Sequence, residues 1–401
     1  MVWLSGFQYR KSHVINSAVD ASTGYQISIT VHKTTGMDSD DDVFIGSNCR
    51  DDFGDIRFTD NDASTELDYW MESYVSGDYA IFWVEVTDNL STDPVTIYIY
   101  YKDDNAMTTS DGDKTFLLFD DFLGSVVDAT KWTSYISGSS TITVADSKVR
   151  VYKGTTGSCY IKGKTYLSSC AMKAKTMSDQ GAINNSIRML CRLTTSNWVQ
   201  ENSLEWIGNS PNEFKSYTTN IGQTAYVLTS PTANVYNLWE ILWKSAVKTT
   251  FKRDGTIDKI HTTAIPTGTL TPNFNNTYSA ECGEVSIYVD WTFVRKYADP
   301  EPVHGGWGTQ EDSTLYLTLD RILTLSEITI KTPKIVFGEG TTFSSIMWTL
   351  GKKKLFAVSS LASDAIFTFT FIFKLRTEIV LGINYARIFL KKFKAYLGGK
   401  A

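Results

Sequence analysis

The stretch that decides the fold is Phe-Asp-Asp-Phe at residues 119–122 with Lys-Trp at 131–132, together with Val-Asp-Trp-Thr-Phe-Val-Arg-Lys-Tyr at 289–297. Between these two ends, short segments of alternating apolar and polar residues are broken by Gly, Asn, Ser and Pro. That pattern predicts a domain of two packed β-sheets. We expect the acidic, aromatic opening and the closing strand to be neighbours, as the first and last strands of one sandwich.

Working outward, the whole chain of 401 residues is long enough for two or three domains, each with its own hydrophobic core. Aromatic residues make up 13% of the sequence, Thr and Ser are abundant, and helical periodicity is nearly absent. This composition favours an all-β fold. We predict two consecutive jelly-roll or lectin-like β-sandwiches at 1–116 and 117–303, then a smaller β-rich domain at 304–401 with a short terminal helix.

Charge is distributed unevenly along the chain. Residues 1–118 carry 7 basic and 21 acidic side chains, whereas residues 306–401 carry 13 basic and 7 acidic ones. An acidic N-terminal region repels the phosphate backbone, so we expect no nucleic-acid partner. Repulsion between acidic domains leaves the basic C-terminal region as the end expected to mediate attachment or assembly.

The cysteine count and the apolar runs limit the class of protein further. Five cysteines without a Cys-x-x-Cys spacing indicate buried thiols in preference to a disulfide framework or a metal site. The first residues lack the apolar core of a signal peptide, and no run approaches about 18 apolar residues. We therefore predict no membrane span, and either a chain that is not exported by that route or a trimmed form.

Several separated motifs in the first 120 residues follow one another in a recognisable order. They are Tyr-Arg-Lys at 9–11, Asp-Ile-Arg-Phe at 55–58, Trp-Val-Glu-Val at 83–86 and Ile-Tyr-Ile-Tyr-Tyr at 97–101. With the Phe-Asp-Asp-Phe that follows, this set resembles the domain of unknown function DUF2341. That family is found in surface and virus-related proteins, many of them archaeal, and is often followed by a concanavalin A-like (laminin G-like) lectin domain, which the 119–302 segment resembles. The resemblance implies a fold and a surface setting, but no established activity.

Residues 304–401 resemble no family and are interpreted from their pattern alone. Strands are expected at 315–319, 327–331 and 367–373, where apolar and polar residues alternate. From Ala386 the apolar spacing changes to i, i+3, i+4, i+7 and i+11, which predicts a short amphipathic helix with lysines on its other face. A phenylalanine-lined strand needs cover, so we expect this region to pack against other subunits of a homo-oligomer.

Carboxylates at the two ends of the middle domain raise the possibility of a calcium site. Carboxylate oxygens are hard donors of the kind that Ca²⁺ needs. Asp120 or Asp121, together with Asp290, would match the structural calcium of many lectin-like sandwiches. Solvated or strand-capping carboxylates are an equally good interpretation of the same residues.

Tryptophans on the middle-domain strands are the candidate glycan contacts, because an indole ring can stack on the apolar face of a sugar. A tryptophan on a strand is more often part of the core, and Trp239 and Trp291 are assigned there. Trp198 and Trp206 are the candidates for a binding surface on the concave sheet.

Catalysis has little support in the sequence. Retaining glycosidases with this kind of sandwich place paired carboxylates two to four residues apart on one strand, and no Glu-x-Asp-x-x-Glu arrangement occurs between Asp120 and Asp290. The four histidines are scattered, and no P-loop or dinucleotide fingerprint is present.

We therefore predict a non-catalytic structural and adhesive protein of a virus particle or surface appendage, located on the virion surface or the cell surface. Its middle domain would present a glycan-binding module to host glycans, and its C-terminal region would join it to like or other subunits. The alternatives are a cell-surface adhesin whose export signal has been removed, and an atypical polysaccharide hydrolase.

Overall fold

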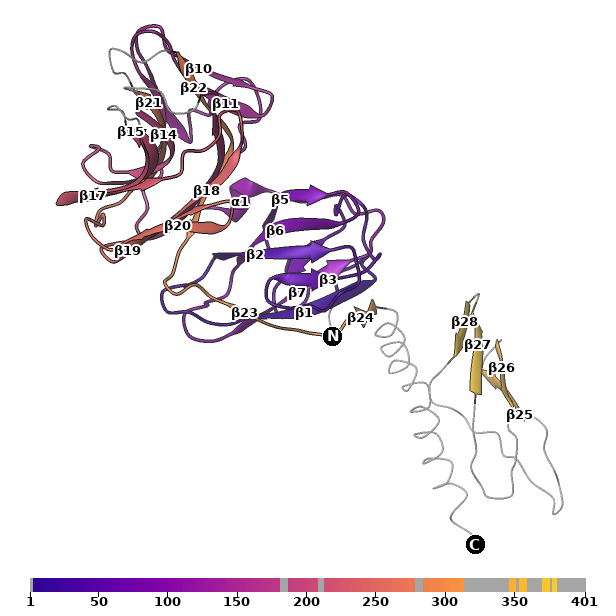
Figure 1. The fold of residues 1–401 in the computed structure, drawn as a ribbon. Helices are drawn as coiled ribbons and strands as arrows, with labels where there is room; N and C mark the ends of the chain where they lie inside the picture. Colours follow the sequence, from indigo (N-terminus) through magenta and orange to yellow (C-terminus); the bar gives the residue numbers. More distant parts are fainter. Residues whose placement is uncertain are drawn as a thin grey trace, which may run out of the picture. The chain divides into compact units, whose positions relative to one another are not determined.

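A computed structural model describes residues 3–180, 187–207, 213–277, 284–313, 346–350, 353–358, 370–375 and 377–380. The chain divides into two compact units, Met1–Leu325 and Ser326–Ala401. Nearly every described element is a β-strand, as Figure 1 shows, and this confirms the predicted all-β class. Within the described residues, no helix is long and apolar enough to cross a membrane.

The first unit begins with an N-terminal sandwich of two sheets. One sheet has the order β23-β1-β7-β4, with β24 also paired to β1, and the other has the order β3-β2-β6-β5. The strands are β1 (Tyr9–Ile15), β2 (Tyr25–His32), β3 (Asp42–Phe44), β4 (Arg57–Thr59), β5 (Tyr69–Val75), β6 (Tyr79–Val86), β7 (Val95–Tyr101), β23 (His304–Trp307) and β24 (Glu311–Asp312). The short helix α1 (Gly112–Thr115) follows β7 and leads to the first strand of the middle domain.

Strand alternation places the core of this sandwich as the sequence predicts. Ile27, Ile29 and Val31 lie on one face of β2 and are buried in a single hydrophobic cluster with residues of β6 and β7. Intervening residues of β2 are less completely covered. Period-two patterning therefore determines which face of these strands is apolar.

The segment after the middle domain returns to the N-terminal sandwich. His304 pairs with Ile15, and Glu311 pairs with Arg10, so β23 and β24 both extend the sheet at β1. Residues 304–313 thus belong to this sandwich and not to the tail domain, whose predicted start was residue 304. The physical reason is that β1 has an open hydrogen-bonding edge, which a nearby extended segment satisfies.

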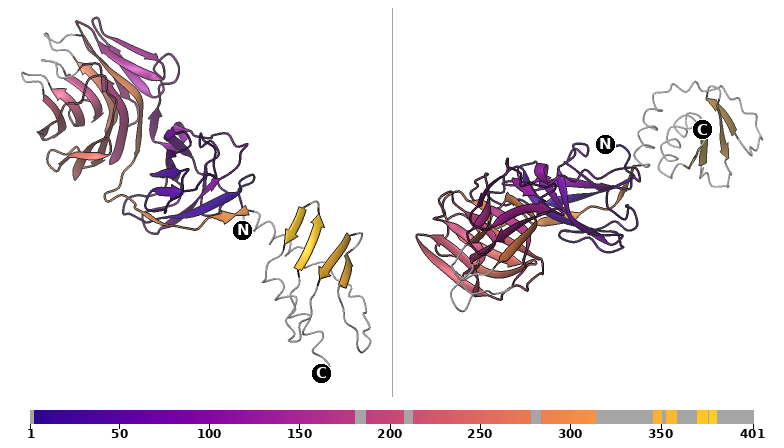
Figure 2. Two further views of the ribbon diagram at one scale, coloured as in Figure 1. Left: turned by 45° about the vertical axis from the view of Figure 1, so that its right-hand side comes forward. Right: turned by 90° about the horizontal axis from the view of Figure 1, so that it is seen from above.

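The middle sandwich packs an eight-stranded sheet on a seven-stranded sheet (Figures 1 and 2). The first has the order β10-β11-β22-β13-β18-β19-β20, with β8 also paired to β22, and the second has the order β17-β16-β15-β14-β21-β12-β9. The first sheet contains β8 (Leu118–Asp120), β10 (Thr141–Ala145), β11 (Lys148–Lys153), β13 (Cys170–Ser178), β18 (Asn237–Lys244), β19 (Lys248–Arg253), β20 (Thr256–His261) and β22 (Val285–Lys296). The second contains β9 (Trp132–Ile136), β12 (Cys159–Gly163), β14 (Ile187–Thr194), β15 (Glu201–Ile207), β16 (Glu213–Asn220), β17 (Gly222–Leu228) and β21 (Thr271–Thr277).

The two ends of the middle domain pair as predicted. β8 runs antiparallel to β22, with Phe119 opposite Phe293 and Asp120 opposite Thr292. Leu118 and Val294 lie in the middle-domain core, whereas Phe119 and Phe293 belong to a separate aromatic cluster that also contains Trp70 and Trp83 of the N-terminal sandwich. One short strand pair therefore closes the middle sandwich and joins it to the first.

Four of the five cysteines are buried free thiols, as the sequence predicts: Cys49, Cys159, Cys170 and Cys191. Cys282 lies outside the described residues.

The C-terminal unit contains a four-stranded antiparallel sheet in the order β25 (Ile346–Leu350), β26 (Lys353–Val358), β27 (Thr370–Leu375) and β28 (Thr377–Val380). This sheet agrees with the predicted β-rich character of the tail. The strands expected at 315–319 and 327–331, the first part of the one expected at 367–373 and the helix expected from Ala386 lie outside the described residues.

Candidate functional site

The outer face of the seven-stranded sheet, which points away from the middle-domain core, gathers the polar and aromatic side chains of that domain. Leu204 and Trp206 of β15 point into the core, so Glu201, Ser203 and Glu205 project to the outer face. Register carries this face across the neighbouring strands. The residues opposite or beside these on the outer face include Tyr217 on β16, Arg192 on β14, Asn273 and Asn275 on β21, Tyr160 and Lys162 on β12, and Tyr135 on β9.

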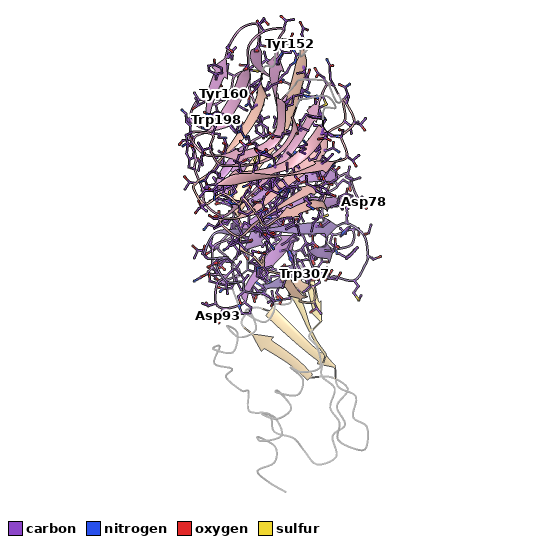
Figure 3. All side chains as sticks on the ribbon, turned by 60° about the vertical axis from the view of Figure 1, so that its left-hand side comes forward. Asp78, Asp93, Tyr152, Tyr160, Trp198 and Trp307 are labelled. Carbon is purple, nitrogen blue, oxygen red and sulfur yellow. The ribbon has the colours of Figure 1, made fainter. Side chains whose placement is uncertain are left out.

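Three aromatic side chains form a row at one side of this face. Tyr135 and Tyr160 lie opposite each other on β9 and β12, and their rings stack with centroids 5.2 Å apart. Trp198, from the turn between β14 and β15, meets Tyr160 edge-on at 5.0 Å. Figure 3 shows Tyr160 and Trp198 side by side on the middle sandwich. All three rings are partly exposed, so this aromatic row is open to a ligand.

Lys162 holds in place the turn that carries Trp198. Lys162 donates hydrogen bonds to the carbonyl oxygens of Thr195 and Ser196 at 3.1 and 2.8 Å. Its ammonium nitrogen also lies 4.2 Å from the Trp198 ring centroid, a cation–π contact. The indole is therefore held in place before any ligand arrives, which reduces the entropy lost on binding.

Beside the aromatic row, a pair of carboxylates shares one strand. Glu201 and Glu205 are four residues apart on β15 and point the same way, but only 7% and 2% of their surfaces are exposed. The pair does not fit the pattern Glu-x-Asp-x-x-Glu, because Ser203 stands in place of the aspartate and the second glutamate comes one position early, at 205. The pattern Glu-x-Ser-x-Glu, followed by the core residue Trp206, was the available signal.

Arg192 lies between these carboxylates and the aromatic row. Its guanidinium group pairs with Glu201, contacts the amide oxygen of Asn273 at 3.3 Å and lies 4.9 Å from the Trp198 ring centroid. Burial lowers the pKa of Arg192 to about 10, so it remains a cation at neutral pH. Glu201 thus has a cationic partner. Burial raises the pKa of Glu205 to about 7.

The two tryptophans predicted to bind glycans lie in different environments. Trp198 lies on the outer face, as expected of a ligand contact. Trp206 does not: its side chain is 1% exposed, packs on Phe214 at 4.9 Å and lies under the guanidinium group of Arg188 at 4.0 Å. The prediction for Trp206 was wrong, because alternation along β15 places it on the core side with Leu204.

The carboxylates predicted to bind calcium are not gathered into one ligand set. Asp120 accepts hydrogen bonds from the indole of Trp132 at 2.6 Å and from the Phe122 backbone, and Asp290 pairs with Lys175 at 2.6 Å. Asp121 is partly buried. In the part of the chain that the structure describes, no group of three or more His, Cys, Asp or Glu side chains could hold a metal ion. Asp120 is the buried acceptor that fixes Trp132.

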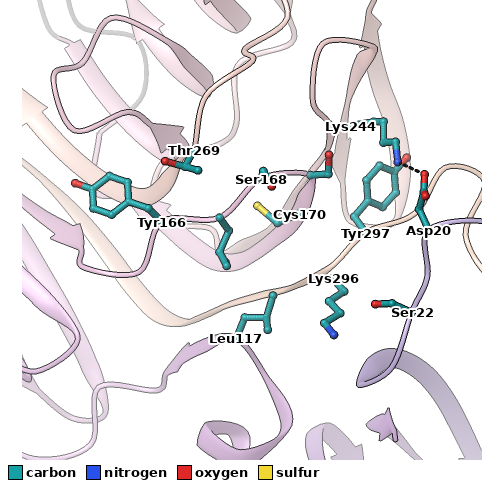
Figure 4. A pocket seen from close by; sticks show the side chains of 12 residues that line it. Asp20, Ser22, Leu117, Tyr166, Ser168, Cys170, Lys244, Thr269, Lys296 and Tyr297 are labelled. Atoms are coloured by element: carbon teal, nitrogen blue, oxygen red, sulfur yellow. Dashed lines mark hydrogen bonds and ion pairs between the residues drawn. The ribbon is translucent and has the colours of Figure 1, made fainter. Parts of the chain in front are cut away.

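A pocket of about 420 Å³ lies where the N-terminal and middle sandwiches meet (Figure 4). Its two lysines already have partners, since Lys244 pairs with Asp20 at 2.9 Å and Lys296 donates to the carbonyl oxygen of Thr23. Burial raises the pKa of the Cys170 thiol to about 12, which keeps it protonated and unreactive. The residues that line the pocket therefore stabilise the contact between the two sandwiches. The outer face remains the stronger candidate site.

The raised pKa of Glu205 makes a testable contribution to stability. Because the folded protein holds this proton above the pH at which the unfolded chain loses it, the free energy of unfolding falls as pH rises from about 4.5 to about 7. We expect Glu205→Gln to remove up to about 3 kcal/mol of this fall, measured as the difference between wild-type and variant urea unfolding at pH 5 and pH 7.5. Glu213→Gln, at a more exposed site on β16, should keep the wild-type dependence. An identical fall in wild type and Glu205→Gln would contradict the assignment.

The geometry defines an all-β protein of paired sandwiches whose middle domain carries an aromatic, carboxylate-containing outer face. Residues 52–135 match the family model described as "Domain of unknown function (DUF2341)". This match covers four of the motifs that carry the resemblance, including Phe-Asp-Asp-Phe at 119–122, and continues into β9, whereas the Tyr-Arg-Lys motif at 9–11 lies before it.

Comparison with solved structures finds similar β-proteins. An uncharacterised protein from Mycobacterium paratuberculosis is 16% identical, with 45% of this chain and 100% of that chain covered and a TM-score of 0.38. A β-1,3-glucanase from Mycobacterium marinum is 14% identical (45% and 98% covered, TM-score 0.38), and a pseudo β-1,3-glucanase of Mycobacterium tuberculosis is 12% identical (46% and 99% covered, TM-score 0.38). A similarity at this level establishes no activity for this chain. No curated protein matches the sequence.

Proposed function

We propose that the protein is a non-catalytic carbohydrate-binding protein whose ligand lies on the outer face of the middle sandwich. The observation that carries the proposal is the row of Tyr135, Tyr160 and Trp198 beside buried polar groups. Sugars combine apolar C–H faces with a rim of hydroxyl groups, so they bind where rings lie next to amide and charged side chains. Asn197, exposed on the same turn, supplies an amide group next to Trp198, whereas Arg192 and Asn273 are 4% and 0% exposed and support the row from the sheet.

The width of the aromatic row suggests the kind of ligand. Three rings from two adjacent strands and one turn present more stacking surface than a single sugar ring needs. We therefore favour an oligosaccharide or polysaccharide segment over a monosaccharide. The neutralised Arg192–Glu201 pair leaves no excess charge at this position, which fits a neutral or weakly charged glycan.

A second function, polysaccharide hydrolysis, is favoured by Glu201 and Glu205. Two carboxylates on one strand, one of them with a pKa raised by burial to about 7, could serve as nucleophile and general acid. Two features weigh against this. Both side chains are almost inaccessible to solvent. Glu201, which would be the nucleophile, is paired with the guanidinium group of Arg192. Binding without cleavage is therefore the better supported function.

We expect Trp198→Ala to weaken glycan binding by roughly tenfold or more, because truncating a central aromatic anchor commonly costs over 1.4 kcal/mol. The wild-type protein is first screened on a glycan array, and the best-binding oligosaccharide is then titrated by calorimetry. Tyr160→Ala should act in the same direction. Tyr74→Ala removes a tyrosine that is 48% exposed on the N-terminal sandwich and should leave the affinity unchanged.

Two outcomes would overturn the proposal. The first is a wild-type protein that binds no glycan, or binds equally well after Trp198→Ala. The second is release of reducing ends from a bound polysaccharide that Glu205→Gln abolishes and Glu213→Gln preserves, which would establish the hydrolase instead.

The wider setting is a proposal of the same standing. Attachment of the basic C-terminal region to further subunits would turn a carbohydrate-binding domain into an adhesive component of a particle or cell surface. Three expectations remain predictions: the virion location, the assembly role of residues 304–401 and a structural calcium ion.

A further inference from the structure

β17 and β20 are edge strands that lie on the same side of the middle sandwich. β17 is the last strand of the seven-stranded sheet, and β20 is the last strand of the eight-stranded one. The two strands adjoin, since Lys259 of β20 lies 3.7 Å from the ring centroid of Tyr226, and Thr263, two residues beyond β20, shares a hydrogen bond of 2.7 Å with Thr224. Two strand edges without a described neighbour therefore lie next to each other.

Exposed apolar side chains gather at this edge. Ile221 is 96% exposed, and Tyr226 and Val227 are 47% and 50% exposed. On β20, Ile257 and Ile260 are 54% and 45% exposed. Single exposed apolar residues are ordinary, but five around two adjoining strand edges form a surface that a partner could cover.

β17 lacks the features that normally protect a strand edge. Natural edges are kept apart by charge, proline, bulges or short length. β17 is seven residues long, pairs with β16 without a register shift, and lies in a stretch with no charged residue between Lys215 and Glu240. Other edge strands have such protection: β20 contains Asp258 and Lys259, while β9 and β10 each have only five residues.

We propose that β17 pairs with β17 of a second copy of this chain across a two-fold axis. A two-fold axis brings a strand against itself, so any charge near the axis would face an identical charge. An uncharged strand is the kind that can be its own partner, whereas an unlike partner would require no such neutrality. With the axis at Ala225, Gln223 lies opposite the second copy's Val227, and Thr224 lies opposite its Tyr226, so every pair of β17 residues is neutral. Lys259 of β20 is a cation near this axis, and it is held over the Tyr226 ring of its own copy.

The pairing joins two seven-stranded sheets into one continuous sheet. β15 lies two strands from β17, so the two copies of the Glu201–Glu205 strand would be five strand spacings apart, roughly 24 Å. Both outer faces would lie on the same side. This consequence rests on the proposed function, because two linked glycan sites bind a multivalent surface far more tightly than one. The pairing itself does not depend on glycan binding.

A cross-link tests the pairing in the full chain. In an antiparallel pair centred on residue 225, the two Cα atoms are about 4.5–5.5 Å apart, within the range for a disulfide. We expect Ala225→Cys, with Cys282→Ser, to form under mild oxidation a reducible species of twice the 44.9 kDa chain mass. Ser134→Cys in the same background places an exposed cysteine on β9, the opposite edge of that sheet, and should not cross-link.

Light scattering supplies the second measurement. Ala225→Lys sets two ammonium groups against each other at the axis and should halve the molar mass at micromolar concentration, while Ser134→Lys should leave it unchanged. Ala225 is exposed, so its substitution leaves the core intact, which circular dichroism checks. The proposal fails if the wild-type chain is monomeric, if Ala225→Lys keeps the wild-type mass, or if only Ser134→Cys cross-links.

Discussion

Arg295→Met is expected to lower the free energy of unfolding by about 3–5 kcal/mol, the cost of breaking a buried ion pair from one side. Arg295 lies on β22 and is 3% exposed. Its guanidinium group donates to Glu301 at 2.5 Å and to Glu240 at 3.1 Å. Burial alone would lower the pKa of Arg295, but Glu301 and Glu240 outweigh it and the net shift is upward. Removing the cation would leave Glu301 without its ion pair, while Glu240 would keep only Lys252 at 3.4 Å.

The same network reaches the N-terminal sandwich through Tyr25, whose hydroxyl donates to Glu301 at 2.8 Å. Adding Glu301→Gln to Arg295→Met should recover part of the lost stability, because it removes the carboxylate charge that lost its ion pair. Lys102→Met breaks the exposed pair with Asp104 and should leave the stability nearly unchanged. Urea unfolding of the three variants measures these differences. A loss below 1 kcal/mol for Arg295→Met would show that the network contributes little.

Trp70→Ala should have an effect of similar size and also change the shape of the unfolding transition. Trp70 is 8% exposed, and its ring lies 4.9 Å from Phe119, 5.3 Å from Trp291 and 5.8 Å from Phe293. Truncating a buried tryptophan commonly costs about 3–5 kcal/mol. This aromatic cluster is separate from the cores of the two sandwiches, so the cavity would weaken the junction more than either core.

Calorimetry on the full chain distinguishes these effects. We expect the two sandwiches of the wild-type protein to unfold together, because they share the aromatic cluster and the ion pair of Lys173 with Glu72 at 2.7 Å. In Trp70→Ala, the two transitions should separate. Tyr74→Ala lies on the same strand but is 48% exposed, and should change the melting temperature little. A single transition at the wild-type temperature in Trp70→Ala would contradict this account of the junction.

The candidate site was only partly predictable, and β15 shows why. Alternation with Leu204 was enough to place Trp206 in the core and the two glutamates outside, so both errors at this strand could have been avoided from the sequence. Trp198 lies in the turn between β14 and β15 and not on a strand as expected, and its glycan-binding role stays a prediction. Its partners Tyr135 and Tyr160 lie about 40–60 residues away along the chain, and no local pattern indicates that they meet it.

The face of β14 on which each arginine lies depends on the fold and not on the local sequence. Arg188 and Arg192 are four residues apart, so strict alternation would place both on one face. A register shift between Met189 and Cys191 reverses the alternation, and as a result Arg188 stacks on the core residue Trp206 while Arg192 reaches the outer face. A bulge forms where the partner strands require an extra residue, which the sequence of β14 alone does not state.

The sequence by itself determined the all-β class, the apolar face of strands such as β2, the buried free state of the four described cysteines and the pairing of the ends of the middle domain. These follow from period-two patterning, residue type and the order of motifs, all of which are local properties. Only the tertiary structure decided that residues 304–313 return to β1, that Arg192 neutralises Glu201 and that Trp70 meets Trp291. Each of these depends on which distant strand edge or charge a segment meets, and burial and hydrogen-bond satisfaction of the whole fold select that partner.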